Sequence, residues 1–364
     1  MKILYDHQMF SIQKYGGVTK YFCELIKNIP PENNYKLSVL FSDNHYLKED
    51  QKIFKKTFLP IPDRDFKLKG RIKDFIYTVN EHFSKKIIKG EDYDIFHPTY
   101  YGNYFLGSLK KPYVITVHDL IAFKDNFYTD TSLRSQMKKT IDNANRIISI
   151  SENTKKDLVE LLHIDEKKID VIYHGYNKPE SEHKKNELGE YILFVGRRSG
   201  YKNFSTFASA ISILFRKEKD LKLVCVGEPF NSKEVSMLKT LDILEKTTVL
   251  TVTEQKLNNL YSNALLFVYP TLYEGFGMPI LEAFANKCPI CVSNTSCLPE
   301  IAGNAALYFD PKEAESIVEA ISKLLQDKDF SSELVDKGSE RLLYFSWKNT
   351  AKQTITSYKK ALGN

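Results

Sequence analysis

Short apolar runs rich in β-branched and aromatic residues alternate with segments of helical periodicity along almost the whole chain, and this alternation restricts the fold more than any other feature. It is typical of βαβ units, in which helices connect parallel strands and cover the sheet. A polar segment over residues 177–189 interrupts the pattern, which then starts again. At 364 residues the chain is also longer than one hydrophobic core usually supports. We therefore predict two α/β domains that face each other across a cleft.

The apolar runs give the predicted strands, and the periodic segments give the helices. Strands of the first domain are predicted at residues 2–5, 35–41, 93–96, 113–117, 146–150 and 170–173, and strands of the second at 191–195, 221–226, 265–269 and 289–292. Helices are predicted from 18 to 29 and at about 204–216, 232–244, 254–262, 279–286 and 314–325. The predicted boundaries are 1–175 for the first domain, 176–189 for a linker, 190–345 for the second domain, and 346–364 for a last helix that packs back toward the first domain.

Composition places the chain among folded proteins of a reducing compartment. Hydrophobic residues make up 42% and charged residues 27% of the sequence. No run approaches the roughly 18 apolar residues that a membrane span needs, and the first ten residues do not resemble a secretory signal, so we expect a cytoplasmic protein. The five cysteines form an odd set without a disulfide spacing. Cys288 and Cys291 lack further zinc ligands, and their apolar neighbours predict buried core cysteines.

The charge distribution says more about partners than the net charge of +6, which is too small to indicate a nucleic acid partner. Residues 52–89 contain 11 Lys and Arg but only 4 Asp and Glu. Apolar residues interleave with these cations, which suits peripheral contact with an anionic membrane. A helix packed on the core with a solvated basic face would give the same pattern. Both interpretations stay open at this point.

The segment 269–283 carries the strongest indication of a binding site. An apolar strand ends at Tyr269, a loop with Gly275 and Gly277 lets backbone N–H groups approach a ligand, and Pro279 stands where a helix can begin. A helix N-terminus beyond the carboxyl end of a parallel strand favours a phosphate.

Two carboxylates bracket that loop. Glu274 lies in the loop and Glu282 in the expected first helical turn, where they can accept hydrogen bonds from sugar and ribose hydroxyls. The alternative is that Glu282 only stabilises the helix dipole and Glu274 is a solvated loop residue.

A second motif, over residues 193–203, joins a strand, a glycine turn and cations ahead of a helix. A guanidinium can grip two phosphate oxygens while a lysine acts as a point charge, and together they neutralise a departing diphosphate without Mg²⁺. A basic surface loop is the alternative interpretation. The residues alone do not decide which of Arg197, Arg198 and Lys202 would take this role.

These motifs resemble those of retaining glycosyltransferase family 4. The frame Glu-Gly-Phe-Gly-x-Pro-x-Leu-Glu-Ala, with seven residues between Glu274 and Glu282, and the Gly-Arg…Lys frame are similar to the signatures of that family. The resemblance implies the GT-B architecture, with an N-terminal acceptor-binding and a C-terminal donor-binding Rossmann-like domain. It implies that Glu274 lies by the donor sugar, that Glu282 holds the ribose, and that Gly275, Phe276 and Gly277 belong to the donor loop. It implies neither a metal nor a cofactor.

The resemblance also assigns residues of the first domain. Gly16 and Gly17 open the first amphipathic helix and would meet the donor phosphates or the acceptor. His118 ends a strand and, like the matching histidine of the family, would hydrogen-bond the donor sugar. His97 is a weaker candidate for the acceptor side. His174 receives no role, because the family commonly has Asn there.

The implied reaction is transfer of a glycosyl unit from a nucleotide diphosphate-sugar to a hydroxyl, with retention at the anomeric carbon. Arg197 and Lys202 would stabilise the departing phosphate, and Glu274 and His118 would orient the sugar. The first domain resembles enzymes of lipopolysaccharide, O-antigen or capsule synthesis, so the expected donor is GDP-mannose and the acceptor a glycan or lipid-linked glycan, with the protein at the inner face of the cytoplasmic membrane. A nucleotide-sugar 2-epimerase, a glycogen- or sucrose-type synthase, and a non-catalytic nucleotide-sugar binding protein are the alternatives.

Overall fold

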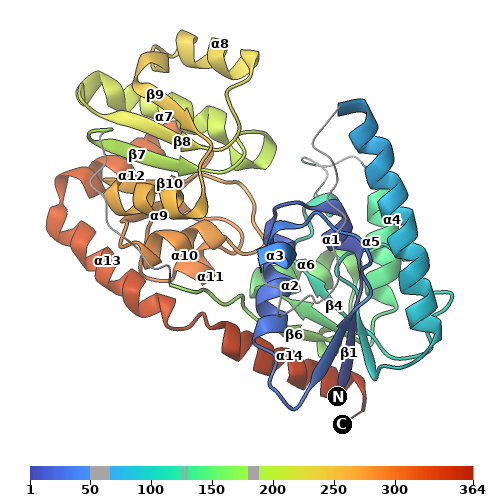
Figure 1. The fold of residues 1–364 in the computed structure, drawn as a ribbon. Coiled ribbons are helices and arrows are strands. Elements are labelled where there is room, and N and C mark those ends of the chain that lie inside the picture. The colour runs from blue at the N-terminus through green and yellow to red at the C-terminus, as the bar shows by residue number, and fades with distance from the viewer. Residues whose placement is uncertain (50–65, 125–126, 128–129, 179–187, 364) are drawn as a thin grey trace. The chain divides into compact units, whose positions relative to one another are not determined.

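The structure, a computed structural model of the chain, describes residues 1–49, 66–124, 127, 130–178 and 188–363. The chain forms two compact α/β units (Figure 1). Unit 1 consists of Met1–Gly175 and Ser346–Asn364, and unit 2 of Tyr176–Phe345. Most of the predicted linker lies outside the described residues, as does the first part of the basic stretch, 52–65.

Unit 1 is built on parallel strands in the order β2-β1-β3 and β4-β5-β6, and an isolated parallel bridge between Phe96 and Tyr113 joins the two groups. The strands are β1 (Lys2–Tyr5), β2 (Asn34–Leu37), β3 (Ile95–His97), β4 (Val114–Val117), β5 (Arg146–Ser149) and β6 (Ile169–Val171). The helices are α1 (Gln8–Ile12), α2 (Gly17–Lys27), α3 (His45–Glu49), α4 (Phe66–Lys89), α5 (Thr131–Asp142), α6 (Glu152–Leu162) and α14 (Trp347–Ala361).

Alternating side chains of these strands pack into two cores on opposite faces of the sheet, as the period of two requires. In β1, Ile3 and Tyr5 enter the core formed with α2 and α14, while Leu4 enters the core that holds side chains of α5 and α6. Helix α14 is also fixed by polar contacts, since Tyr358 Oη lies 2.9 Å from Tyr5 Oη. Its first residue packs so closely on Gly175 that a Cβ there would lie 2.1 Å from the backbone nitrogen of Trp347.

Unit 2 contains a six-stranded parallel sheet in the order β12-β11-β10-β7-β8-β9. The strands are β7 (Tyr191–Val195), β8 (Lys222–Val226), β9 (Thr247–Leu250), β10 (Leu266–Tyr269), β11 (Ile290–Ser293) and β12 (Leu307–Phe309). The helices are α7 (Phe204–Lys217), α8 (Ser232–Thr240), α9 (Glu254–Asn263), α10 (Met278–Ala285), α11 (Leu298–Ala302), α12 (Ala314–Gln326) and α13 (Lys328–Leu342). This is the doubly wound order, in which the winding direction reverses between β7 and β10.

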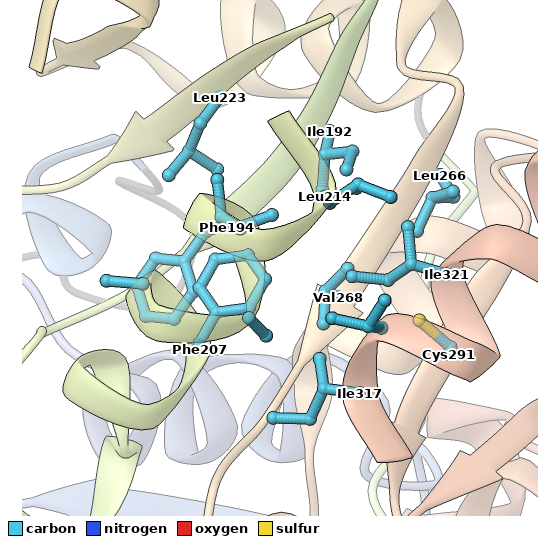
Figure 2. Close-up of a cluster of buried hydrophobic side chains, with 14 of the residues drawn as sticks. Ile192, Phe194, Phe207, Leu214, Leu223, Leu266, Val268, Cys291, Ile317 and Ile321 are labelled. Carbon is cyan, nitrogen blue, oxygen red and sulfur yellow. The ribbon is translucent and has the colours of Figure 1, made fainter. Parts of the chain in front are cut away.

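One face of this sheet packs on α7 and α12 in a large apolar core (Figure 2). Phe194 of β7 stacks on Phe207 of α7 with ring centroids 5.6 Å apart, and Ile317 and Ile321 of α12 are fully buried in the same core. The opposite face packs on α9 and α10, where Tyr261 meets Phe267. Both faces are covered, so the strands read as continuous apolar runs.

The sequence predicted most strands but missed two, and it placed the ends of β2 and α8 too far along the chain. Strands β9 and β12 lie at the edges of the sheet, are only three or four residues long and leave most of their side chains partly exposed. Strand β2 ends at Leu37, short of the predicted residue 41. Beyond it, the backbone N–H groups of Leu40 and Phe41 donate hydrogen bonds to the Asn80 side chain of α4 instead of to a neighbouring strand. Helix α8 ends at Thr240 instead of 244.

Three sequence-level expectations can be checked against these elements. The α/β fold with parallel sheets in both units is confirmed. Cys288 and Cys291 are confirmed as buried, unpaired core cysteines. Within the described residues, no helix combines the length and the apolar character needed to cross a membrane.

Candidate functional site

The point where the sheet of unit 2 reverses its winding brings together the two motifs that the sequence singled out. Strand β7 leads into residues 196–203, and its neighbour β10 leads into the loop 270–277. Ligands of doubly wound sheets bind outside the carboxyl ends of the strands at such a point. Both motifs therefore leave the sheet at its expected ligand-binding edge.

Lys202 and Glu274, which come from separate motifs, form an ion pair at this edge. Lys202 Nζ lies 2.6 Å from Glu274 Oε1, and only 16% and 13% of the two side chains are exposed. Lys202 Nζ also donates a hydrogen bond to the Tyr269 hydroxyl at 3.3 Å. Burial, helped by the Glu274 carboxylate, raises the pKa of Tyr269 well above its ordinary value, so its hydroxyl stays protonated. The lysine and the carboxylate thus hold each other in place, a pairing that their positions in the sequence did not reveal.

The glycine loop leads directly into α10. Gly277 precedes the helix with φ of 95°, a left-handed conformation that favours glycine, and a Cβ there would lie 3.1 Å from a Leu298 methyl group. Pro279 occupies the start of the helix, and no side chain of the described residues caps its N-terminus. The loop therefore offers backbone N–H groups and the positive end of a helix dipole to an anion. The Phe276 ring itself is buried against Phe345, so the ring does not face this site.

Glu282 is held by a residue that the sequence did not single out. It is the fifth residue of α10, so its expected position in the first helical turn is wrong, and the interpretation as a simple dipole-stabilising charge loses its basis. The buried Tyr261 hydroxyl of α9 donates a hydrogen bond to Glu282 Oε2 at 3.0 Å. From the sequence alone, Tyr261 is one of several apolar residues of a predicted helix, and nothing indicates that its hydroxyl binds Glu282.

Arg197 and Arg198 have different environments. The Arg197 side chain is exposed and has no hydrogen bond or ion pair to any described residue. Arg198, in contrast, is 4% exposed and binds Glu234, with Nε 2.9 Å from Oε1. Its guanidinium also donates to the backbone carbonyls of Glu228 and Pro229 at 2.6 and 3.1 Å. Arg197 thus has its whole guanidinium available to a ligand, whereas Arg198 holds the loop after β8 against the loop after β7 and keeps only Nη1 without a partner among the described residues.

These loops enclose a cavity of about 600 Å³ at the carboxyl ends of β7, β8 and β9. The cavity is lined by residues 196–199, 226–229, Asn231, Glu234, Thr251 and Val252. Thr251 and Val252 of this lining follow directly after β9.

In unit 1, His118 follows β4, and its backbone N–H donates to the Tyr101 hydroxyl at 3.1 Å. Its ring packs edge-on against Tyr21, with centroids 5.0 Å apart. Burial lowers the pKa of His118 to about 3, so the imidazole is neutral near pH 7. Its Nε2 atom is buried and has no hydrogen-bond partner among the described residues. A neutral ring with one nitrogen unused can hydrogen-bond a sugar hydroxyl.

Gly16 and Gly17 lie at the start of α2. A Cβ on Gly16 would come within 2.0 Å of the Gln13 side chain, whereas nothing lies within 4 Å of the Cβ position of Gly17. No side chain of the described residues caps this helix end. A side chain on Gly16 would have to displace the end of the flexible Gln13 side chain, whereas the space around Gly17 is open.

His97 does not have the role of an acceptor-side ligand that the sequence suggested. Its Nδ1 lies 2.6 Å from Tyr358 Oη and its Nε2 lies 3.0 Å from Thr116 Oγ1. Nδ1 thus attaches α14 to the sheet, and Nε2 links β3 to β4, so both ring nitrogens are engaged.

A buried carboxylate that the sequence left unassigned lies where the winding of unit 1 reverses, between β1 and β3. Asp6 accepts hydrogen bonds from the backbone and hydroxyl of Thr99 at 2.8 and 2.7 Å, and from the Gln8 side chain at 2.7 Å. The neighbouring His7 is fully buried, with Nε2 unpartnered within the described part of the chain. The signal in the sequence is a polar Asp-His pair directly after a strand.

The fold and the site define a doubly wound α/β protein with a ligand-binding edge in unit 2, and the comparisons with known proteins specify it further. The family model "Glycosyltransferase Family 4" matches residues 15–178, and the model "Glycosyl transferases group 1" matches residues 175–341. The chain belongs to the family 4 glycosyltransferases.

Relatives and solved structures agree with this assignment. The chain is 32% identical to the O-antigen chain mannosyltransferase RfbU of Salmonella typhimurium over 59% of this chain and 61% of RfbU. It is 25% identical to O-antigen chain mannosyltransferase B of Escherichia coli over 94% of this chain and 96% of that protein. HepE of Anabaena, solved in complex with UDP and glucose, is 14% identical and superposes with a TM-score of 0.75 over 99% of both chains. That likeness supports the GT-B fold.

Proposed function

We propose that this chain transfers mannose from GDP-mannose to a hydroxyl of a glycan or lipid-linked acceptor in cell-surface polysaccharide synthesis, with retention at the anomeric carbon. The observation that carries the proposal is the Lys202–Glu274 ion pair at the ligand-binding edge of unit 2, beside the open N-terminus of α10. The similarity to O-antigen mannosyltransferases supports the choice of sugar and of acceptor class.

In this proposal the charges of unit 2 stabilise the departing diphosphate. The exposed Arg197 guanidinium and the first N–H groups of α10 bind phosphate oxygens. As the bond from the anomeric carbon to the diphosphate breaks, the bonding electron pair leaves with the diphosphate. Lys202 then shares its hydrogen bonds between Glu274 and the departing phosphate, which is electrostatic stabilisation of charge that develops in the transition state. These cations supply what a metal ion supplies elsewhere, so we propose that the reaction needs neither a metal nor a cofactor.

The carboxylates orient the donor. Glu274, once it shares Lys202 with the phosphate, can accept hydrogen bonds from sugar hydroxyls, and Glu282, fixed by Tyr261, accepts hydrogen bonds from the ribose. The acceptor oxygen attacks the anomeric carbon from the face that the diphosphate leaves, and a diphosphate oxygen receives the acceptor proton. Retention follows from this same-face replacement.

We propose that unit 1 binds the acceptor and contributes two contacts to the donor. The neutral His118 ring has an unused Nε2 for a sugar hydroxyl, and the α2 N-terminus at Gly17 has no side-chain cap among the described residues. We further propose that α4 contacts an anionic membrane at the cytoplasmic face, because Arg71, Lys86 and Lys89 are exposed on it and the Phe75 side chain is 68% exposed.

The proposal is tested by GDP release from GDP-mannose in the presence of EDTA, with and without a mannose-terminated acceptor. We expect acceptor-dependent release that EDTA leaves unchanged. The Glu282→Ala variant should lose most of the acceptor-dependent GDP release, while Glu333→Ala, a change on the surface of α13, should retain it. GDP-mannose that is converted without an acceptor into another GDP-sugar, with no GDP released, would indicate an epimerase, and donor that binds but is never consumed would indicate a binding protein. Either result would overturn the proposal.

A further inference from the structure

The cavity at the ends of β7, β8 and β9 is lined by polar groups of two kinds. Some form hydrogen bonds or ion pairs within the protein, and others have no partner among the described residues. Glu234 is fully engaged: it binds Arg198 and accepts the backbone N–H of Asn231 at 2.8 Å. Thr251 is also engaged, since its hydroxyl donates to the carbonyl of Gly227 at 2.9 Å. The exposed Glu228 carboxylate, in contrast, has no hydrogen bond or ion pair with any residue that the structure describes.

We infer that this cavity takes the base of the donor nucleotide and that Glu228 selects guanine, an inference that rests on the proposed function. The cavity volume of about 600 Å³ accommodates a nucleoside. Its lining carries the unengaged Arg197 guanidinium on the β7 loop and the unengaged Glu228 carboxylate on the β8 loop. A cation for the phosphates and an acceptor for a base thus line the same cavity.

The floor of the cavity is suited to a flat ring. Gly196 and Gly227 directly follow the adjacent strands β7 and β8, and a Cβ on Gly227 would come within 2.9 Å of the Gly196 carbonyl oxygen. Arg198 Nη1, which is buried and has no hydrogen-bond partner among the described residues, would lie 3.2 Å from the same Cβ. A planar base can therefore approach the backbone of Gly227 closely, beside the edge of this guanidinium.

The backbone of Glu228 is fixed by Arg198. The Arg198 guanidinium binds the carbonyls of Glu228 and Pro229, and it also lies over the Phe230 ring, 4.7 Å from the centroid. Because Glu234 belongs to the capping box of α8 and binds the same guanidinium, the whole turn is tied to the start of a helix. A carboxylate on such a fixed turn is preorganised for one hydrogen-bonding pattern.

The hydrogen-bonding pattern of a carboxylate matches guanine among the common bases. A carboxylate only accepts hydrogen bonds, through two oxygens. Guanine presents two adjacent donors, N1–H and the 2-amino group, which a carboxylate accepts in a bidentate manner. Uracil presents a single N–H between two carbonyl oxygens, and adenine an amino group beside a bare ring nitrogen. For both of these bases one carboxylate oxygen would face a lone pair, which disfavours them.

Isothermal titration calorimetry with GDP, IDP, UDP and ADP tests the inference, because IDP differs from GDP only by the missing 2-amino group. We expect the unaltered chain to bind GDP roughly 10- to 100-fold more tightly than IDP, UDP or ADP. Glu228→Gln should remove most of this preference and leave the affinity for UDP equal or higher. Glu245→Gln, an exposed change elsewhere in unit 2, should alter nothing. The melting temperature of each variant without nucleotide controls for folding.

The outcomes separate this inference from the proposed function. Equal affinity for GDP and IDP, tighter binding of UDP or ADP, or an unchanged preference in Glu228→Gln would overturn the role of Glu228 while the donor site stands. Absence of binding by every nucleotide would overturn the donor site, and with it both proposals.

Discussion

The Nζ atom of Lys202 lies 2.6 Å from Oε1 of Glu274, although the two residues are 72 positions apart in the sequence. The pair places a cation and a carboxylate between the loops that follow β7 and β10, with little exposure to water. In the proposed function each member of the ion pair also contacts the donor: Lys202 binds a phosphate oxygen and Glu274 accepts hydrogen bonds from the sugar.

Removal of Lys202 is expected to slow the chemical step more than it weakens donor binding. Lys202→Ala should lower kcat by about 100-fold, because a cation aimed at developing charge stabilises the transition state more than the ground state. Steady-state kinetics with varied GDP-mannose measures both constants. A variant with unchanged kcat and only a raised KM would show that Lys202 serves binding alone.

Tyr261 is expected to act through Glu282. Tyr261→Phe removes the hydroxyl that holds the Glu282 carboxylate at 3.0 Å and leaves the ring in the core. We expect KM for the donor to rise by roughly 3- to 10-fold, the effect of one hydrogen bond to a charged group acting indirectly, with kcat nearly unchanged. Tyr191→Phe, which removes another buried hydroxyl of unit 2, serves as the matched control. Equal effects of both variants would make the contribution of Tyr261 structural.

Arg198 is expected to stabilise the fold of unit 2. Arg198→Ala should reduce the free energy of unfolding by about 3 kcal/mol, because it leaves the partly buried Glu234 carboxylate and two carbonyls without their donor. Urea denaturation followed by circular dichroism measures this change. The exposed Arg197→Ala should change stability by no more than about 0.5 kcal/mol, so similar losses in both variants would contradict the distinction between the two arginines.

Because the His97 imidazole is buried, we expect the chain to lose stability in mild acid. Burial lowers the pKa of His97 to about 3, below its ordinary value of 6.5. Between these two values the unfolded chain binds the proton and the folded chain does not, so stability falls as the pH falls below 6.5.

From pH 6.5 to pH 5 this group alone should remove about 2 kcal/mol from the free energy of unfolding. Urea titrations at pH 7 and pH 5 measure the change, and His97→Gln should show a pH dependence smaller by that amount. The same slope in both proteins would mean that His97 is already protonated in the folded state.

Much of the fold could be predicted because both sheets are covered on both faces. Strands such as β7 and β10 are then continuous apolar runs that stand out from the chain. The edge strands β9 and β12 could not be found in the same way, because an edge strand buries few side chains. The early end of β2 depends on Asn80, whose amide comes from a distant helix.

The site was predictable to the extent that topology determines it. Motifs that follow β7 and β10 meet at one edge of a parallel sheet, so topology brings them together. The choice of Arg197, Lys202, Glu274 and Glu282 within these motifs came from the family resemblance. The partners of these residues were not predictable from sequence. Which of two adjacent arginines turns inward depends on the position of α8, and Tyr261 looks like any other apolar helical position until α10 packs against α9.

The most direct test of the central claim is a proton NMR time course of the unaltered chain with GDP-mannose and a mannose-terminated acceptor. The account predicts that GDP and an α-linked product appear together and in equal amounts, since an α-linked donor with retention gives an α-linked product. A β-linked product would contradict the retaining mechanism. Consumption of GDP-mannose without any glycosylated acceptor would contradict the assignment as a transferase of mannose.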